Sequence, residues 1–325
     1  MRYGTAGAFR MALERRLLET SRQNGLPLTR LRKAVVFERM LARLVRADGD
    51  LWVLKGAVAL EFRRKGQSRA TKDLDLGYAR PKEDTLAKLQ AAARQDIGDG
   101  FVFAVERASE ISEDDPGAVR YQVRAELAGR TFEEIHVDVA FGDPLIGTPE
   151  RVTGPGLLEF AGVKTPVIPA LPLEQHVAEK VHAYTRTYGQ GKPSSRPKDL
   201  VDLVLIGSFA RLDANRLREA LDRIFAARAT HPLPKALPAP PERWRTPFRI
   251  MAMEVGLDPD LRVGHGLAAR LVDPVLQGKV KNSRWDPAAF AWVTLRTRSP
   301  RRPRPASRSP LSPTKAKEAR RGSVT

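Results

Sequence analysis

The sequence predicts an α+β protein, in which a small mixed sheet is preceded by helices and followed by a helical region. Three observations predict it. In the first hundred residues apolar positions recur at helical spacing, then in short runs or alternation, in the order helices, strand, helix, strand, helix. Strand-like segments then follow one another directly, and after Pro172 the spacing becomes helical again. This order favours a mixed sheet over a doubly wound one.

Two amphipathic helices are expected at the start of the chain. Residues 6–23 and 28–46 each carry apolar residues at helical spacing among charged ones. The sequence Asp48-Gly49-Asp50 then indicates a turn. Residues 1–48 are therefore assigned to a segment of N-terminal helices.

Residues 49–170 are expected to form the α/β core. It begins with a short apolar strand over 51–54, which Gly56 separates from a helix over 57–65. In residues 71–78, acidic residues and glycine alternate with leucine and tyrosine, which is typical of a strand with one buried face. The remaining expected elements are a helix over 84–96 and strands over 101–105, 118–127 and 134–141.

Residues 171–295 are expected to form a C-terminal helical domain, and five prolines between 231 and 241 indicate an irregular connection within it. The basic segment 296–325 combines proline, serine and arginine with few apolar residues, so it is expected to be disordered. The expected helices of the domain span 173–188, 198–209, 213–228 and 248–255.

Composition excludes several classes of site. The 325 residues contain no cysteine and five histidines, which rules out disulfides and cysteine nucleophiles and argues against a zinc enzyme. No apolar run of about 18 residues occurs and the start of the chain lacks a signal-peptide pattern, so we expect a cytoplasmic protein that does not enter a membrane.

The chain is strongly basic, with a net charge of +18. Residues 296–325 hold ten Lys or Arg and one Glu, a net of +9, so residues 1–295 carry the other +9. This charge suits a phosphate-rich partner, but it is equally compatible with a solvated surface that is rich in arginine.

The strongest chemical signal is the pair Asp73 and Asp75, two positions apart on one strand. Side chains at i and i+2 share a face, and two carboxylates held a few ångströms apart repel each other unless a cation lies between them. Mg²⁺ suits such a pair, because it accepts carboxylate oxygens and keeps positions open for phosphate oxygens. A solvated strand face or a turn is the alternative interpretation.

Two further features strengthen this interpretation. Gly56 and Ala57 stand where a strand leads into a helix, and a glycine there lets a phosphate approach the backbone N–H groups. Asp138 alternates with buried valines on a later strand and would add a third carboxylate if that strand lies beside the Asp73 strand. The alternative for Asp138 is an ion pair with an arginine.

Downstream, Lys180 and the segment Lys198-Asp199-Leu200-Val201-Asp202 lie on predicted helices. Lys180 could contact triphosphate oxygens as a point charge, although such a lysine is commonly solvated. Asp202 stands among apolar residues, so burying it requires a partner, for which Lys180 and Lys198 are candidates.

Together these segments resemble the AbiEii/AbiGii-type toxin nucleotidyltransferases, which are related to the MenT toxins. The resemblance runs in order over roughly residues 6–295. It implies a polymerase-β-like nucleotidyltransferase core followed by a helical domain. It is carried by Leu54-Lys55-Gly56, Thr71-Lys72-Asp73-Leu74-Asp75-Leu76, Val137-Asp138-Val139, Glu179-Lys180-Val181-His182-Ala183 and Arg196-Pro197-Lys198-Asp199-Leu200-Val201-Asp202-Leu203.

The resemblance also implies roles for single residues. The metal-binding pair of the family falls on Asp73 and Asp75, its phosphate-contacting lysine on Lys180, and its essential late acid on Asp202. Lys198 and Asp199 belong to the same late motif, and Thr71 stands where related toxins often have a modifiable serine. Ala57 departs from the family pattern, which has a second glycine or a hydroxyl residue there, so we expect weaker or altered nucleotide binding.

The expected function is therefore Mg²⁺-dependent transfer of a nucleotide from an NTP to an acceptor, as in the toxin of a toxin–antitoxin or phage-defence system. The resemblance implies the 3′ end of tRNA, or another RNA, as a possible acceptor and a cognate antitoxin as a partner. Two alternatives are a metal-dependent nuclease and a non-catalytic protein that binds nucleic acid or an antitoxin.

Overall fold

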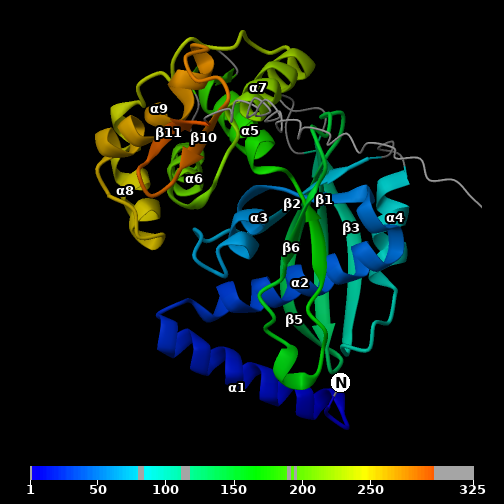
Figure 1. Ribbon diagram of the computed structural model, residues 1–325. Coiled ribbons are helices and arrows are strands. Elements are labelled where there is room, and N and C mark those ends of the chain that lie inside the picture. Colours follow the sequence, from blue (N-terminus) through cyan, green and yellow to red (C-terminus); the bar gives the residue numbers. More distant parts are fainter. Residues whose placement is uncertain (1, 80–83, 111–117, 189–191, 194–195, 296–325) are drawn as a thin grey trace, which may run out of the picture. The chain divides into compact units, whose positions relative to one another are not determined.

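The computed structural model describes residues 2–79, 84–110, 118–188, 192–193 and 196–295 (Figure 1). Contacts between residues group Met1–Thr294 into one compact unit and Leu295–Thr325 into a second. The segment 296–325, which was predicted to be disordered, lies outside the described residues.

The elements of the first unit largely follow the order that the sequence predicts, and the α+β fold class is confirmed. The helices are α1 (Ala6–Asn24), α2 (Leu28–Asp48), α3 (Gly56–Arg63), α4 (Thr85–Ala93), α5 (Leu173–Thr185), α6 (Pro197–Phe209), α7 (Ala214–Arg228), α8 (Arg245–Glu254) and α9 (Leu261–Leu276). The strands are β1 (Trp52–Leu54), β2 (Asp73–Tyr78), β3 (Phe101–Glu110), β4 (Ala118–Leu127), β5 (Arg130–Ala140), β6 (Glu150–Thr153), β7 (Val167–Ala170), β8 (Thr187–Tyr188), β9 (Lys192–Pro193), β10 (Ser283–Asp286) and β11 (Ala291–Thr294).

Seven of the described strands form one mixed sheet in the order β3-β4-β5-β2-β1-β7-β6. Strand β2 lies parallel to β5 and antiparallel to β1, so the strand with the Asp pair is central. The condition under which Asp138 would add a third carboxylate, that its strand lies beside the Asp73 strand, is therefore met.

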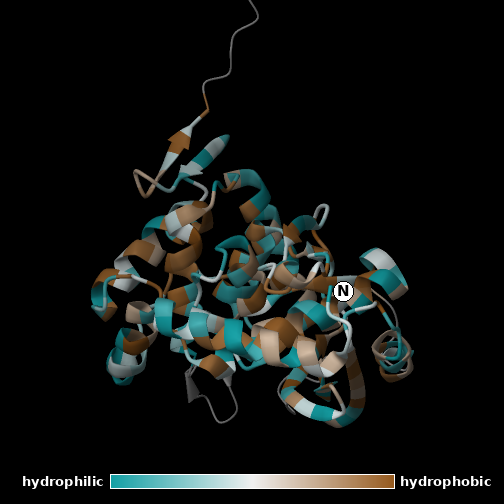
Figure 2. Cartoon of the chain, turned by 90° about the horizontal axis from the view of Figure 1, so that it is seen from below, coloured by the Kyte–Doolittle hydropathy of each residue, from teal (hydrophilic) through white to brown (hydrophobic). Residues whose placement is uncertain are grey.

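The two faces of the sheet differ in chemistry. Along β2 the exposed fraction alternates, with Leu74 and Leu76 buried and the two aspartates partly accessible. The buried face joins a core formed with α1, α2 and α4, and α2 packs against β5, β7 and α4. Figure 2 shows hydrophilic and hydrophobic residues alternating along the helices, as expected for helices with one buried side. The opposite face of β2 carries the acids.

A second hydrophobic core is formed by α5 to α9 together with Trp285 of β10. Helix α6 is its centre, since it contacts α5, α8 and α9. Leu60 of α3 belongs to this core while Val58 and Phe62 belong to the first, so α3 packs against both. The domain boundary predicted near residue 170 stays a prediction.

Strand β7 and helix α9 are among the elements that were not predicted, and both have a local reason. Pro169 lies within β7 and Pro274 lies within α9. Proline is unfavourable inside a strand or a helix, so the sequence did not indicate either element. Gly264 also weakens the helical pattern of α9, but a Cβ there would lie 2.3 Å from the Phe248 ring, so the glycine permits close packing. Helix α5 ends at Thr185, earlier than the predicted residue 188.

No helix in the described part of the chain combines the length and apolar character needed to cross a bilayer.

Candidate functional site

A cleft of about 320 Å³ lies where the acid-bearing face of the sheet meets α5 and α6. It brings together eight of the residues that the sequence singled out, which are Gly56, Thr71, Asp73, Asp75, Asp138, Lys180, Lys198 and Asp199. Ala57 and Asp202 do not line it, because Ala57 is buried in α3 and Asp202 is buried behind Lys180.

The acids occupy adjacent positions on two parallel strands. Asp75 is the register partner of Asp138, and Asp73 is the register partner of His136. On the far side of β5, Arg120 of β4 is the register partner of Asp138. Parallel strands lie about 4.8 Å apart, so this register alone places the carboxylates of Asp75 and Asp138 side by side.

Arg120 binds the acid cluster from one side. Its Nε donates to Asp138 Oδ1 at 2.8 Å and its Nη2 donates to Oδ2 at 2.7 Å, which is a bidentate pair. Nη2 also lies 3.6 Å from Asp73 Oδ2. Hydrogen bonding to Asp138 is the main reason that the pKa of Arg120 is raised.

Asp75 has a different environment. Among the described residues no side chain forms a hydrogen bond or an ion pair with its carboxylate. Burial raises the pKa of Asp75, and the nearby Asp138 and Asp73 raise it further, against the opposing effect of Lys180. This carboxylate therefore lacks a directly bound cation.

Gly56 makes room for that carboxylate. A Cβ at Gly56 would lie 1.8 Å from Asp75 Oδ2, and the residue has a φ of +63°. The backbone N–H of Lys55 donates to the carbonyl oxygen of Asp75 at 2.9 Å, which ties the start of α3 to β2. Only glycine satisfies both the positive φ and the close approach.

Lys180 is held by two buried acids. Its Nζ lies 2.9 Å from Asp199 Oδ1 and 2.7 Å from Asp202 Oδ2, and its side chain is 9% exposed. Burial alone would lower the pKa of Lys180, but Asp199 and Asp202 outweigh it and the pKa is raised. The proposed partnership of Lys180 with Asp202 is present.

Arg69 is a second partner of Asp202 that the sequence did not indicate. Its Nε and Nη2 donate to the two carboxylate oxygens of Asp202 at 2.9 and 3.0 Å. Burial opposes ionisation of Asp202, but Lys180 and Arg69 outweigh it and hold its pKa well below the usual range. The segment before β2 is thereby fastened to α6.

Lys198 lines the same cleft but differs from Lys180 in its partners. Among the described residues no acidic side chain forms an ion pair with it. Burial lowers the pKa of Lys198, and the neighbouring Arg196 lowers it further. A bound anion would therefore relieve the unfavourable burial of its charge.

A second charged network lies beside the start of α3. Lys55 Nζ is 3.1 Å from Asp143 Oδ2 and 2.9 Å from Glu179 Oε2, and Arg228 donates to both oxygens of Asp143. Burial opposes the charge of Lys55, but Glu179 and Asp143 outweigh it and raise its pKa. This network joins the β1–α3 junction to α5 and α7.

Arg69, Arg120 and Arg228 were not predicted as site residues. The residues around each of them form no recognisable motif. Each arginine pairs with an acid that lies at least 18 positions away in the chain. Strand order would have revealed Arg120, because it occupies the position beside Asp138 across β4 and β5.

The acid cluster fits a divalent cation with two protein carboxylates. The partly buried Asp75 carboxylate has no ion-pair partner among the described residues and Asp73 lies on the same strand face, and Mg²⁺ commonly binds one or two carboxylates together with substrate phosphates. Over the described residues, no three histidine, aspartate or glutamate side chains come together as a metal-binding group. Arg120 pairs with both carboxylate oxygens of Asp138.

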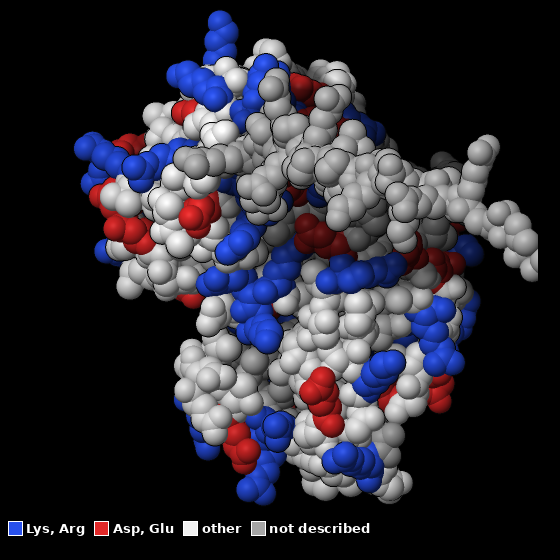
Figure 3. Space-filling view, viewed as in Figure 1, with Lys and Arg blue, Asp and Glu red and all other residues white. Residues whose placement is uncertain are grey.

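Charge is concentrated around the cleft. In the view of Figure 3, Lys and Arg side chains gather in the middle of the face shown, with acidic side chains among them. The cleft itself is lined by Lys55, Arg69, Arg120, Lys180, Arg196, Lys198 and Arg228. This lining suits a polyanionic ligand.

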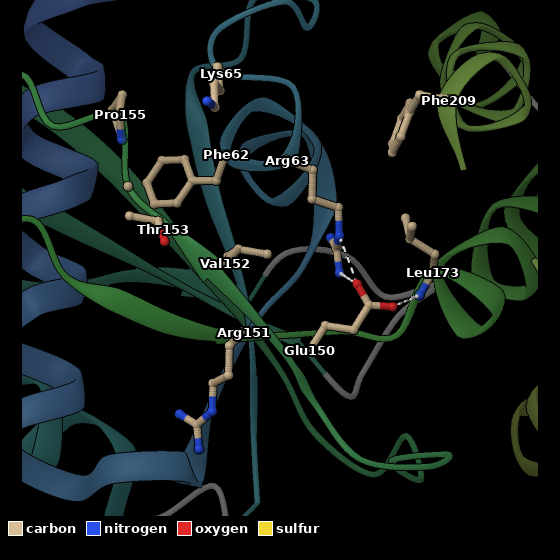
Figure 4. Close-up of a pocket in the computed structure, with 11 residues that line it drawn as sticks. Phe62, Arg63, Lys65, Glu150, Arg151, Val152, Thr153, Pro155, Leu173 and Phe209 are labelled. Atoms are coloured by element: carbon tan, nitrogen blue, oxygen red, sulfur yellow. Dashed lines mark hydrogen bonds and ion pairs between the residues drawn. The ribbon is translucent and has the colours of Figure 1, made fainter. Parts of the chain in front are cut away.

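A larger cavity of about 680 Å³ lies beside β6, between α3 and the ends of α5 and α6. Figure 4 shows that its acid, Glu150, is directed toward Arg63 and the backbone N–H of Leu173, with Phe62 and Phe209 on other sides. The Glu150 oxygens accept hydrogen bonds from both groups. The described lining of this cavity therefore offers no acid without a partner, in contrast to Asp75 in the cleft.

Comparison with known families decides the class of protein. The family model described as nucleotidyl transferase AbiEii toxin, Type IV TA system, matches residues 39–271, which include every residue of the cleft. The chain belongs to this family. It is thus a nucleotidyltransferase of the toxin type, and the resemblance found in the sequence is confirmed.

A solved structure shares the fold. The AbiEii-family chain is similar to MenT4, a nucleotidyltransferase toxin from Mycobacterium tuberculosis H37Rv, with a TM-score of 0.52 and 21% identity over 82% of this chain and 97% of MenT4. A provisionally assigned nucleotidyltransferase from H. pylori matches with a TM-score of 0.42 and 17% identity, over 78% of this chain and 99% of that one. No curated protein matches the chain.

Proposed function

We propose that the chain transfers a nucleotide from an NTP to an acceptor hydroxyl, with Mg²⁺ held by Asp73 and Asp75. The observation that supports it is the partly buried Asp75 carboxylate, which has no cation partner among the described residues and faces a cleft lined by lysine and arginine. A carboxylate of this kind is stabilised when a cation and its ligands enter the cleft.

Mg²⁺ would neutralise charge on the triphosphate and on the attacking oxygen. The residues of the chain hold the reactants. Asp73 and Asp75 project from one face of β2, and Gly56 leaves the space that the Asp75 carboxylate needs. Asp138 was predicted as a third metal ligand, and that role stays a prediction.

The phosphates of the NTP would lie between α3 and α6. The N-terminus of α3, at Gly56 and Ala57, offers backbone N–H groups and the positive end of a helix dipole. Lys198 supplies a cation that no described acid neutralises. Lys180 was predicted as the phosphate contact, and in this proposal its bonds to Asp199 and Asp202 limit it to a longer-range contribution.

In the reaction an acceptor hydroxyl attacks the α-phosphorus in line. The new P–O bond forms as the bond to the β-phosphate oxygen breaks, pyrophosphate leaves, and the hydroxyl proton passes to solvent or to a carboxylate in the cleft. The basic character of the chain supports an RNA acceptor, such as the 3′ end of tRNA. The family supports an antitoxin protein as partner, and a cytoplasmic location stays a prediction.

The test combines labelled NTPs, RNA and Mg²⁺ with the wild-type chain and Asp75→Asn. We expect wild type to lengthen the RNA and to release pyrophosphate, and Asp75→Asn to do neither. Asp222→Asn, at an exposed aspartate of α7, is the matched control and should behave as wild type. Loss of NTP binding in Asp75→Asn, measured by calorimetry with Mg²⁺, should accompany the loss of transfer.

Two other outcomes would change the conclusion. Shortened RNA without pyrophosphate release would indicate a metal-dependent nuclease. If Asp75→Asn bound NTP and extended RNA like wild type, the metal role of the Asp pair would be refuted and a non-catalytic binding protein would have to be considered.

A further inference from the structure

Arg120 occupies a position in the cleft where a cation would otherwise be needed. Its side chain is 31% exposed, it pairs with both oxygens of Asp138, and it reaches Asp73 at 3.6 Å. The guanidinium therefore lies on the β4 side of the three carboxylates, and Asp75 is the one it does not contact.

We infer that Arg120 is a positioning residue that replaces a second divalent cation, so that the site binds one metal ion at Asp73 and Asp75 and none at Asp138. This inference rests on the proposed function. It concerns how many ions the acids hold, and a site with two ions would leave nucleotidyl transfer itself intact.

The geometry of Asp138 is the first argument. A bidentate guanidinium pair orients both carboxylate oxygens toward Arg120 and away from Asp75. The register fixes this arrangement, because Arg120, Asp138 and Asp75 are successive partners across β4, β5 and β2. Asp138 could turn toward a metal only by giving up two short charge-assisted hydrogen bonds.

Charge is the second argument. An arginine in a protein does not lose its proton, so a metal ion bound to Asp138 would lie beside a permanent positive charge. With Arg120 neutralising Asp138, the remaining carboxylates of Asp73 and Asp75 carry two negative charges, which one divalent ion balances. A second ion would have to be balanced by the substrate alone.

The third argument comes from the partners of the acids. Asp73 has Arg120 and His136 nearby, the latter with Nδ1 at 3.4 Å, whereas Asp75 has no direct partner among the described residues. Asp75 is therefore the acid that lacks a bound cation, whereas Arg120 already balances the charge of Asp138.

The test counts metal ions. Mn²⁺ alone is titrated into the full-length protein, and free Mn²⁺ is measured by electron paramagnetic resonance. We expect one ion per wild-type chain, and no ion at that site in Asp75→Asn. Arg120→Gln should bind a second ion, because Asp138 is then released to act as a ligand. Asp138→Asn in the wild-type background should keep one ion with affinity within about threefold.

Controls separate charge from shape. Arg120→Lys keeps the positive charge and should keep one ion. Arg124→Gln changes an arginine on the same face of β4 that pairs with Glu126, and it should also keep one ion. Thermal unfolding of each variant verifies folding, and the wild-type count does not depend on any variant.

The outcomes are distinguishable. Two ions per wild-type chain, or a tenfold or greater loss of affinity in Asp138→Asn, would overturn the inference while leaving the proposed function in place. A folded Arg120→Gln that still binds one ion would overturn it as well. If wild type binds no Mn²⁺, the metal role of the Asp pair fails, and this inference fails with it.

Discussion

Gly56 and Asp75 lie on different elements, yet the Asp75 side chain can take its position only because residue 56 has no side chain. Asp75 Oδ2 fills the volume that a Cβ at position 56 would occupy. A glycine before a helix usually suggests a phosphate-binding turn, and here it also sets where a carboxylate can lie. Substitution of Gly56 tests the second role.

Gly56→Ala should destabilise the fold and displace Asp75. The positive φ costs about 1–2 kcal/mol, and the clash with the carboxylate adds to it. Gly66→Ala is the matched control, since Gly66 has a φ of +90° and open space around its Cβ position. We expect both variants to lose stability in urea unfolding, but only Gly56→Ala to lose Mn²⁺ binding. Equal metal binding in the two variants would contradict this account.

At this scale the sequence predicted part of the site. Alternation of acidic and apolar residues placed Asp73 and Asp75 on one face of their strand and Asp138 opposite the valines of its own strand, because strand side chains alternate whatever the tertiary structure. It left open whether the two strands are neighbours, which the parallel pairing of β2 with β5 answers. It could not predict Arg69 or Arg120, because their partners are set by strand order and helix packing. Nothing local to either arginine indicates an acid beside it.

At the scale of elements, buried ion pairs fasten α6 to the sheet. Asp202 of α6 accepts from Arg69, which precedes β2, and from Lys180 of α5. All three side chains are at most 10% exposed, so removing one leaves a buried charge without its partner. Breaking such a pair typically costs about 3–5 kcal/mol.

Asp202→Asn should therefore lower the free energy of unfolding by about 3 kcal/mol at pH 7. The folded pKa of Asp202 is depressed below its ordinary 3.8, so its ionisation stabilises the fold above about pH 4. That contribution is lost as the pH falls, and the difference between wild type and variant should shrink by about 1 kcal/mol at pH 3. Urea unfolding at both pH values measures it.

A difference that stays constant between pH 7 and pH 3 would show that Asp202 does not ionise more readily in the folded state. Arg69→Lys offers a second measurement, because it keeps the charge but loses the two-pronged contact with Asp202. It should lie between wild type and Asp202→Asn in stability at pH 7.

Elements with strong periodicity were predicted well, and those with conflicting residues were not. Helices α1, α2 and α7 carry regular apolar stripes, and their bounds fall within two residues of those predicted. Strand β7 and helix α9 are held by tertiary packing despite proline inside them. Packing decides those segments, and a local pattern cannot show it.

At the scale of the whole molecule, one compact unit ends at Thr294. The cleft, both hydrophobic cores and the β10–β11 hairpin lie within it. The basic segment after it contributes half of the net charge of +18.

A chain truncated after Leu295 should fold and keep its cleft. We expect cooperative thermal unfolding with a midpoint within about 2 °C of the full chain, and unchanged Mn²⁺ binding. RNA binding should become weaker and less dependent on salt, because fewer counterions are released when fewer cations contact the backbone. Filter binding at several salt concentrations measures it, and loss of cooperative unfolding would refute the independence of the unit.

The placement of the cleft has a consequence for the order of synthesis. Asp73 and Asp75 precede Lys180, Lys198 and Asp202 by more than a hundred residues, and the lysines and late acid come from helices of the second core. A ribosome that has released only the sheet has therefore made the acids and the start of α3 without Lys180, Lys198 and Asp202. The cleft is therefore complete only after α6 has emerged and packed against the sheet.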